Sequence, residues 1–195
     1  MIIRAILVHG WDGNPENAWF PWMRERLEMK KFVVIAPAMP DPAVPKIEPW
    51  IDCLGKSIVR LKKDDMLIGH SIGCQAILRY LQGEKAKAMG AVLVAPWLHL
   101  DEKTIAEEGD DAQKIAKPWI ETPIDWKSAR AACSEFVCIF SDNDPYVPLS
   151  DAEIFRKKLS SKIIIEKKMG HFDDSAGIRE LPCALKAVFD LAGIS

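Results

Sequence analysis

This 195-residue sequence lacks long apolar segments and a strong excess of charge of either sign. Its apolar N-terminal stretch, residues 1–8, is too short for a signal peptide or a membrane span, and it contains Arg4. The lack of a signal peptide and of a membrane span at this position predicts a cytoplasmic protein. The net charge of −2 gives no general attraction to nucleic acid or to an anionic membrane, so we expect neither as a partner.

The cysteines lack the spacing of a disulfide framework or of a metal site. Their number is odd, they are widely separated, and no C-x-x-C or paired Cys/His pattern occurs. We therefore expect reduced, mostly buried thiols and no metal. A chain of this length buries a large core without such support, and we predict one domain over residues 1–195. The five cysteines are Cys53, Cys74, Cys133, Cys138 and Cys183.

What the sequence does contain is a regular alternation of apolar runs and amphipathic segments. This alternation predicts an α/β protein, a three-layer α/β/α sandwich around a mostly parallel six-stranded sheet. One connection is unusually long, and we expect residues 97–135 to form a charged helical excursion that covers the site rather than a second domain. The predicted strands are 2–8, 32–36, 66–69, 91–95, 136–141 and 162–166, and the predicted helices are 22–31, 48–62, 72–81, 149–159 and 178–191.

The motif Gly-x-Ser-x-Gly at residues 69–73 follows an apolar strand and opens onto a helix. A strand, a sharp turn and a helix in this order predict a nucleophile elbow with Ser71 as the nucleophile. Glycine is needed at Gly69 and Gly73 because the serine backbone is strained and a side chain two residues away would collide. The alternative is a plain glycine-rich turn in which Ser71 caps the helix.

A serine hydroxyl becomes nucleophilic when a histidine takes its proton, and a carboxylate must orient that histidine. His171 follows the last predicted strand and completes the chain order serine, acid, histidine, so we predict it as the base rather than a surface-loop histidine. Asp142 and Asp144, in the loop after the preceding strand, both qualify as the acid. Their alternatives are an Asx turn or a calcium loop, although the glycine that a calcium loop requires is absent.

The other three histidines are weaker candidates for the base. His70 directly precedes Ser71 at the end of a strand, so its side chain should leave on the opposite face. His9 belongs to the loop after the first strand. His99 lies in the long excursion, where the sequence assigns it no role.

The oxyanion of a tetrahedral intermediate needs N–H donors, and we predict the backbone N–H groups of Ile72 and Trp11 for this role. Trp11 belongs to the loop after the first strand, whose alternative interpretation is a tight turn. Gly10 and Trp97 follow strand ends and are candidate substrate-binding residues. For the tryptophans the alternative is ordinary surface packing.

With these pieces in place, the chain resembles the small serine-hydrolase family of retinoblastoma-binding protein nine and its bacterial relatives, within the α/β-hydrolase superfamily. The resemblance covers nearly the whole length and implies a minimal α/β-hydrolase fold that lacks the first two strands of larger hydrolases. In that family the acid is the aspartate directly before the proline, which implies Asp144. The resemblance is carried by Val8-His9-Gly10-Trp11, Gly69-His70-Ser71-Ile72-Gly73, Ala95-Pro96-Trp97, Ser141-Asp142-Asn143-Asp144-Pro145-Tyr146-Val147-Pro148 and Gly170-His171-Phe172.

One departure from the family limits what the resemblance implies. The L-x-C-x-E motif associated with retinoblastoma binding is absent, and the nearest string is Ala131-Ala132-Cys133-Ser134-Glu135, so this protein-binding role is not carried over. We predict a serine hydrolase that cleaves small acyl esters through an acyl-enzyme on Ser71 and needs no cofactor. A peptidase or amidase with the same residues, or a non-catalytic binding protein, are the alternatives. Charges crowd the covering stretch, which predicts short acyl chains.

Overall fold

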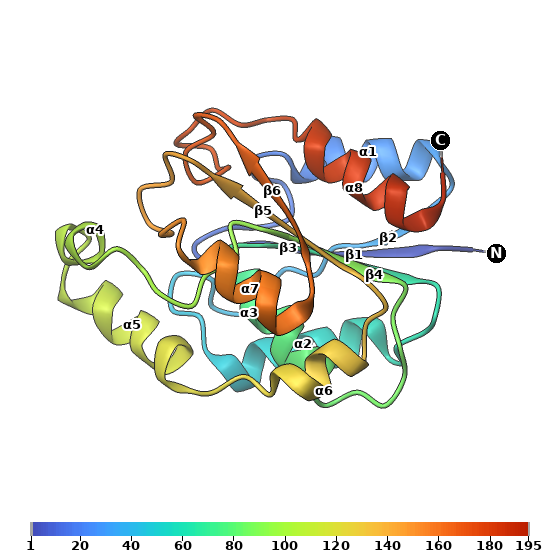
Figure 1. The fold of residues 1–195 in the computed structure, drawn as a ribbon, viewed down its shortest axis with the longest axis horizontal. Coiled ribbons are helices and arrows are strands. Elements are labelled where there is room, and N and C mark those ends of the chain that lie inside the picture. The colour runs from blue at the N-terminus through green and yellow to red at the C-terminus, as the bar shows by residue number, and fades with distance from the viewer. Residues whose placement is uncertain (1, 195) are drawn as a thin grey trace.

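A computed structural model describes residues 2–194, which form a sheet enclosed by helices (Figure 1). The strands are β1 (Arg4–Val8), β2 (Val33–Ile35), β3 (Asp65–His70), β4 (Gly90–Val94), β5 (Phe136–Ser141) and β6 (Lys162–Glu166). The helices are α1 (Phe20–Met29), α2 (Ile47–Ile58), α3 (Ile72–Gln82), α4 (Glu102–Glu107), α5 (Asp110–Glu121), α6 (Trp126–Ala131), α7 (Asp151–Leu159) and α8 (Pro182–Ala192).

The six strands pair in parallel in the order β2-β1-β3-β4-β5-β6. The central strands β3, β4 and β5 are buried along their whole length, which explains why their apolar runs do not alternate with polar residues. Helices α1 and α8 cover one face of the sheet, and α2, α3, α6 and α7 cover the other (Figure 1). The predicted α/β/α sandwich is confirmed.

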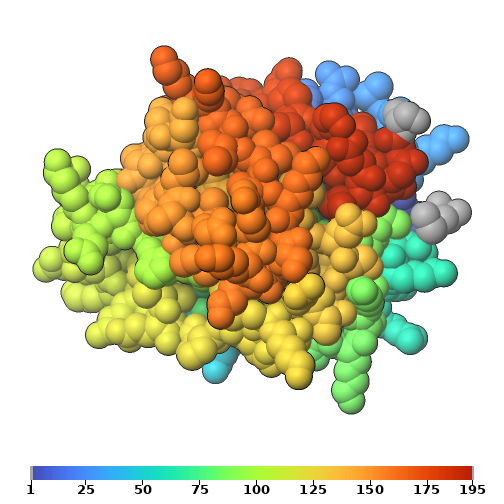
Figure 2. All heavy atoms as spheres, viewed as in Figure 1, coloured from blue at the N-terminus to red at the C-terminus, as the bar shows by residue number. Residues whose placement is uncertain are grey.

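The carboxyl ends of parallel strands meet at one edge of the sheet, so the loops after β1, β3, β5 and β6 gather there. Beside these loops, α4 and α5 extend from the body of the molecule and form one end of its surface (Figures 1 and 2). The long excursion therefore divides in two. Its last helix, α6, packs against α3 as part of the sandwich, while α4 and α5 lie over the strand ends.

The largest differences from the helix boundaries that periodicity predicts are at the end of α2 and at the start of α8. Helix α2 ends at Ile58 rather than at residue 62, because Val59 has a positive φ of 61° and donates its N–H to Gly55. Helix α8 begins at Pro182 rather than at residue 178. The N–H of Ile178 donates to the carbonyl of Asp173, so residue 178 still belongs to the loop that follows β6.

Large aromatic side chains fill the core beneath the strand ends. Trp50, on α2, is fully buried, packs edge-on against Trp119 of α5 and donates its indole N–H to the carbonyl of Pro40. Trp119 is also buried and donates to the carbonyl of Pro45. These contacts fix α5 against the body of the protein. Within residues 2–194, none of the helices has the length and apolar character needed to cross a membrane.

Candidate active site

Ser71 stands in a strained turn between β3 and α3. Its backbone has φ 53° and ψ −123°, and its N–H donates to the carbonyl of Val94 on the neighbouring strand over 2.9 Å. A Cβ at Gly73 would lie 2.5 Å from the carbonyl oxygens of both Val8 and His9. The turn thus presses against the end of β1, and only glycine leaves room for this approach.

Gly73→Ala is expected to destabilise the protein by about 3 kcal/mol, because the obstructing atoms are backbone and cannot rotate away. Gly55→Ala is the matched control. A Cβ at Gly55 meets nothing within 4 Å in the middle of α2, so alanine there should stabilise by about 1 kcal/mol. Urea unfolding of both variants measures the difference, and equal stabilities would contradict the close packing at Gly73.

Three side chains from three strand ends meet at this turn. His171 Nε2 lies 2.9 Å from Ser71 Oγ, and His171 Nδ1 lies 2.8 Å from Asp144 Oδ2. Both the histidine and the carboxylate are almost completely buried. With the Nδ1 proton on the carboxylate side, Nε2 directs its lone pair at the serine hydroxyl. Such an arrangement is able to remove the proton of Ser71 and to stabilise the resulting imidazolium.

The two aspartates that the sequence left as candidates have different partners. Asp144 Oδ1 accepts the backbone N–H groups of Tyr146 and Val147, at 2.9 and 3.0 Å, which leaves Oδ2 for His171. Asp142 instead accepts the N–H of Lys168 at 2.8 Å. Asp142 therefore holds the loop after β6 in place, while Asp144 contacts the imidazole itself.

His70 lies close to His171 without contacting the serine hydroxyl. Its Nε2 is 2.7 Å from the carbonyl oxygen of His171, so a proton on Nε2 donates to that carbonyl. Burial, and then the neighbouring His171, lower the pKa of His70 to about 4. Trp19 donates to the next carbonyl, that of Phe172, at 3.0 Å. The backbone that carries His171 is thus tied to β3 and to the start of α1.

The remaining two histidines have structural partners. His9 Nε2 accepts the N–H of Met39 at 2.9 Å, and its Nδ1 lies 2.9 Å from the carbonyl oxygen of Gly10. Burial lowers the pKa of His9, which favours this neutral form. His99 Nδ1 lies 2.6 Å from the buried Asp151. His9 consequently shapes the loop after β1, and His99 lies at the start of the excursion.

Two backbone N–H groups near the cavity lack a hydrogen-bond acceptor among the described residues: that of Ile72, the residue after Ser71, and that of Trp11, which lines the same cavity as Ser71. Ile72 is the first residue of α3, so the positive end of the helix dipole also points to this spot. Gly10 lies directly behind, where a Cβ would be 2.8 Å from the ring of His70 and 3.3 Å from Ser71 Cβ.

A cavity of about 480 Å³ opens above Ser71 and His171. Trp11 and Trp97 form part of its wall, whereas Gly10 lines a smaller neighbouring cavity of about 210 Å³ instead. Sequence reasoning missed the other wall residues, although one signal was present: apolar residues recur at helical spacing on α5. The remaining lining residues are Asp12, Ala43, Leu100, Ile105, Glu108, Ala112, Ile115, Tyr146, Asp173 and Ser175.

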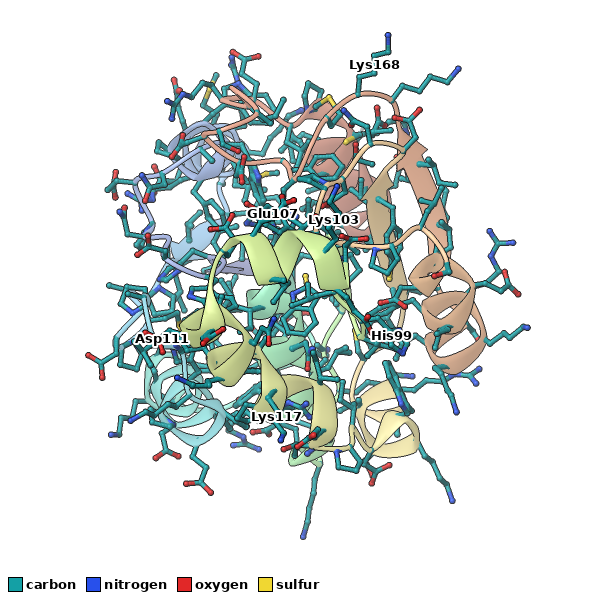
Figure 3. All side chains as sticks on the ribbon, turned by 90° about the vertical axis from the view of Figure 1, so that its left-hand side faces the viewer. His99, Lys103, Glu107, Asp111, Lys117 and Lys168 are labelled. Carbon is teal, nitrogen blue, oxygen red and sulfur yellow. The ribbon has the colours of Figure 1, made fainter. Side chains whose placement is uncertain are left out.

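Several charged side chains of the excursion lie on its outer face, whereas Glu108 lines the cavity. Ile105 on α4 and Ile115 on α5 turn toward the cavity, while Lys103, Asp111 and Lys117 lie on the outside of the same two helices (Figure 3). The stretch therefore offers more apolar surface to the cavity than its many charges suggest, with Glu108 as its charged residue on that wall. Within residues 2–194, no group of three or more His, Cys, Asp or Glu side chains is arranged to hold a metal ion.

Comparisons with known proteins agree with this fold. The crystal structure of YdeN from Bacillus subtilis is similar with a TM-score of 0.88 at 23% identity, covering 98% of this chain and 99% of that one. A carboxylesterase of the thaumarchaeon Nitrososphaera gargenis is similar with a TM-score of 0.69 at 12% identity, covering 98% and 89%. The protein therefore has the α/β-hydrolase fold.

The sequence comparisons narrow the class to a family. A family model described as serine hydrolase matches residues 5–190, so the chain belongs to the serine hydrolase family. YdeN, named as a hydrolase, is 25% identical over 183 residues, 93% of this chain and 92% of that protein. The serine hydrolase RBBP9 of Rattus norvegicus is 25% identical over 175 residues, 88% of each chain. The predicted family is confirmed.

Proposed function

We propose that this protein cleaves small acyl esters through an acyl-enzyme on Ser71, with His171 as the base and Asp144 as the acid. The observation that carries the proposal is the 2.9 Å approach of His171 Nε2 to Ser71 Oγ at the floor of a cavity. Two neighbouring N–H groups without acceptors support it, because they match the needs of an oxyanion. The family membership of the chain supports hydrolysis as the reaction class.

In the proposed reaction, Ser71 Oγ attacks the ester carbonyl carbon and its proton passes to His171 Nε2. The carbonyl oxygen becomes an oxyanion that accepts the N–H groups of Trp11 and Ile72. When the intermediate collapses, the bond to the alcohol oxygen breaks and the imidazolium returns its proton to that oxygen. A water molecule then repeats the sequence on the acyl-enzyme, releasing the acid and restoring the hydroxyl of Ser71.

The acyl-chain dependence of hydrolysis tests the proposal. Each methylene that fits the cavity contributes about 0.8 kcal/mol, so kcat/KM should rise with chain length only until the cavity is full. We expect p-nitrophenyl acetate and butyrate to be turned over better than the dodecanoate and palmitate. An amide series on the same acyl groups, measured in parallel, distinguishes an esterase from an amidase. Specificity that keeps rising up to palmitate would contradict a closed acyl pocket.

A pair of variants on α5 gives this test its control. Ile115 lines the cavity, so Ile115→Ala should enlarge it and move the optimum toward longer acyl chains by about two to three methylene groups, because the change removes the three carbon atoms beyond Cβ. Ile120 lies on the same helix, is 44% exposed and does not line the cavity. Ile120→Ala should therefore leave the chain-length profile unchanged.

A further inference from the structure

The cavity above Ser71 carries charge of one sign. Three carboxylates line it, those of Asp12, Glu108 and Asp173, and no described lysine or arginine does. They come from three separate segments: the loop after β1, the end of α4 and the loop after β6. Negative charge lining a concave surface raises the local concentration of cations and lowers that of anions.

The carboxylate of Asp173 is fixed in place beside the catalytic loop. It accepts the hydroxyl of Ser175 at 2.6 Å and the N–H of Ala176 at 3.0 Å. Burial alone would raise the pKa of Asp173, but these hydrogen bonds, together with the neighbouring His171 and His70, outweigh it and lower the pKa. Asp173 is therefore ionised at neutral pH.

Glu108 is linked to the same wall through Tyr146. The phenol of Tyr146 donates to Glu108 Oε1 at 2.9 Å, and its ring stands edge-on to His171 with 5.1 Å between the centroids. Burial, with Glu108 as a second cause, raises the pKa of Tyr146 to about 12, so the phenol keeps its proton. This tie holds Glu108 over the cavity.

Neighbouring cations have partners outside the cavity. Lys103 lies 3.9 Å from Glu107 on α4, and Arg179 pairs with Asp174. Lys168, after β6, extends away from the body of the molecule (Figure 3). None of these three cations lines the cavity, so they leave its carboxylates without a partner of opposite charge there.

A second feature of the cavity, independent of its charge, also points to a ligand. Trp97 lines the cavity and is only 1% exposed, yet its indole N–H has no acceptor among the described residues. A buried donor without a partner costs free energy, which a substrate oxygen that reached this N–H from the cavity would recover. The rings of Trp11 and Tyr146 add aromatic surface, which attracts organic cations.

We infer that this cavity selects small esters that carry a cationic ammonium group near the scissile bond. The ammonium group lies among Asp12, Glu108 and Asp173, and a substrate oxygen accepts the N–H of Trp97. This inference rests on the proposed ester hydrolysis at Ser71 and adds a preference for substrate charge. An ester with an anionic group in the same position is disfavoured by the same three carboxylates.

Three butyrate esters of different charge test the inference: that of choline, which is permanently cationic, that of its neutral isostere 3,3-dimethylbutanol, and that of isethionate, which is anionic. Each kcat/KM is divided by the rate constant for hydroxide hydrolysis, which corrects for the leaving group. At low salt we expect the choline ester to exceed the neutral ester by about tenfold, and the isethionate ester to fall about tenfold below it. In about 1 M salt, where charges are screened within about 3 Å, the differences should shrink.

Variants then assign the preference to these carboxylates. The combined change Asp12→Asn, Glu108→Gln, Asp173→Asn should bring the three esters within about twofold of each other, because no charge remains on the wall. The control neutralises three carboxylates on α4 and α5 that do not line the cavity, through Glu102→Gln, Glu107→Gln and Asp110→Asn. It alters net charge equally and should keep the order of the esters. Glu108→Gln alone, at an exposed site, should already reduce the choline preference by about twofold.

The outcomes separate this inference from the proposed function. If wild-type protein hydrolyses the neutral ester but shows no preference for the choline ester, the charge inference is overturned and the esterase proposal stands. If the control variant loses the preference as fully as the cavity variant, the preference comes from net charge and the assignment to the cavity is wrong. If wild-type protein hydrolyses none of the three, the proposed function itself fails.

Discussion

Ser71→Ala is expected to lower kcat for ester hydrolysis by about 10⁶-fold, since the variant has no oxygen with which to form an acyl-enzyme. The same variant should lose all labelling by a fluorophosphonate, because only a serine with a paired base is nucleophilic enough to react. In the structure, Ser71 Oγ is hydrogen-bonded to His171. Intact-mass measurement after incubation with the probe detects one adduct on the wild type and none on the variant.

The matched control is Ser57→Ala, on α2. Ser57 does not line the cavity, and alanine is a good helix former, so labelling and turnover should equal those of the wild type. Peptide mapping should place the adduct on Ser71. Equal labelling of the Ser71→Ala variant would refute its role as nucleophile and would favour a non-catalytic binding protein.

Asp144→Asn should lower kcat by about 10⁴-fold with little change in fold stability. Its Oδ1 accepts two backbone N–H groups and Oδ2 faces His171 Nδ1. An amide in place of the carboxylate presents N–H₂ to the imidazole, which favours the tautomer with its proton on Nε2, and that tautomer is unable to accept the proton of Ser71. Steady-state kinetics on a short-chain ester measure the loss.

Asp142→Asn is the control for this change, two residues away in the same loop. The amide oxygen of asparagine is still able to accept the N–H of Lys168, so kcat should fall by less than about tenfold. Thermal unfolding of both variants shows whether the loop remains folded. A larger loss of kcat in Asp142→Asn than in Asp144→Asn would show that the wrong carboxylate has been assigned.

Local patterns were sufficient to predict much of the fold. The apolar runs at β5 and β6 were predicted with the bounds that the structure has. Strand β5 is buried along its whole length and needs consecutive apolar residues, whereas β6 lies at the edge of the sheet and its isoleucine run is bounded by Lys162 and Glu166. Boundaries failed where long-range contacts decide them. Helix α8 begins only at Pro182, because the N–H groups of Gly177 and Ile178 donate to the carbonyls of Asp174 and Asp173 in the loop after β6. Helical periodicity in the sequence does not predict such hydrogen bonds.

The excursion shows the same division between local and long-range information. Its helical character was predictable, and the spacing of Ala112, Ile115 and Trp119 marks one apolar face of α5. The charges along the segment nevertheless suggested a polar cover. Which face turns to the cavity depends on Trp119, whose indole N–H reaches the carbonyl of Pro45 in a distant loop. The sequence of residues 97–135 alone does not predict this contact, because Pro45 lies outside that segment.

The sequence by itself determined the order of the elements and the elbow around Ser71, because strand, glycine turn and helix are encoded within a few consecutive residues. Only the tertiary structure decided that the carboxylate of Asp144 contacts His171 while that of Asp142 holds Lys168. It also brought three carboxylates from three segments into one cavity. These contacts form because parallel strands end at a common edge of the sheet, where hydrogen bonds between the loops join residues that are far apart in the chain.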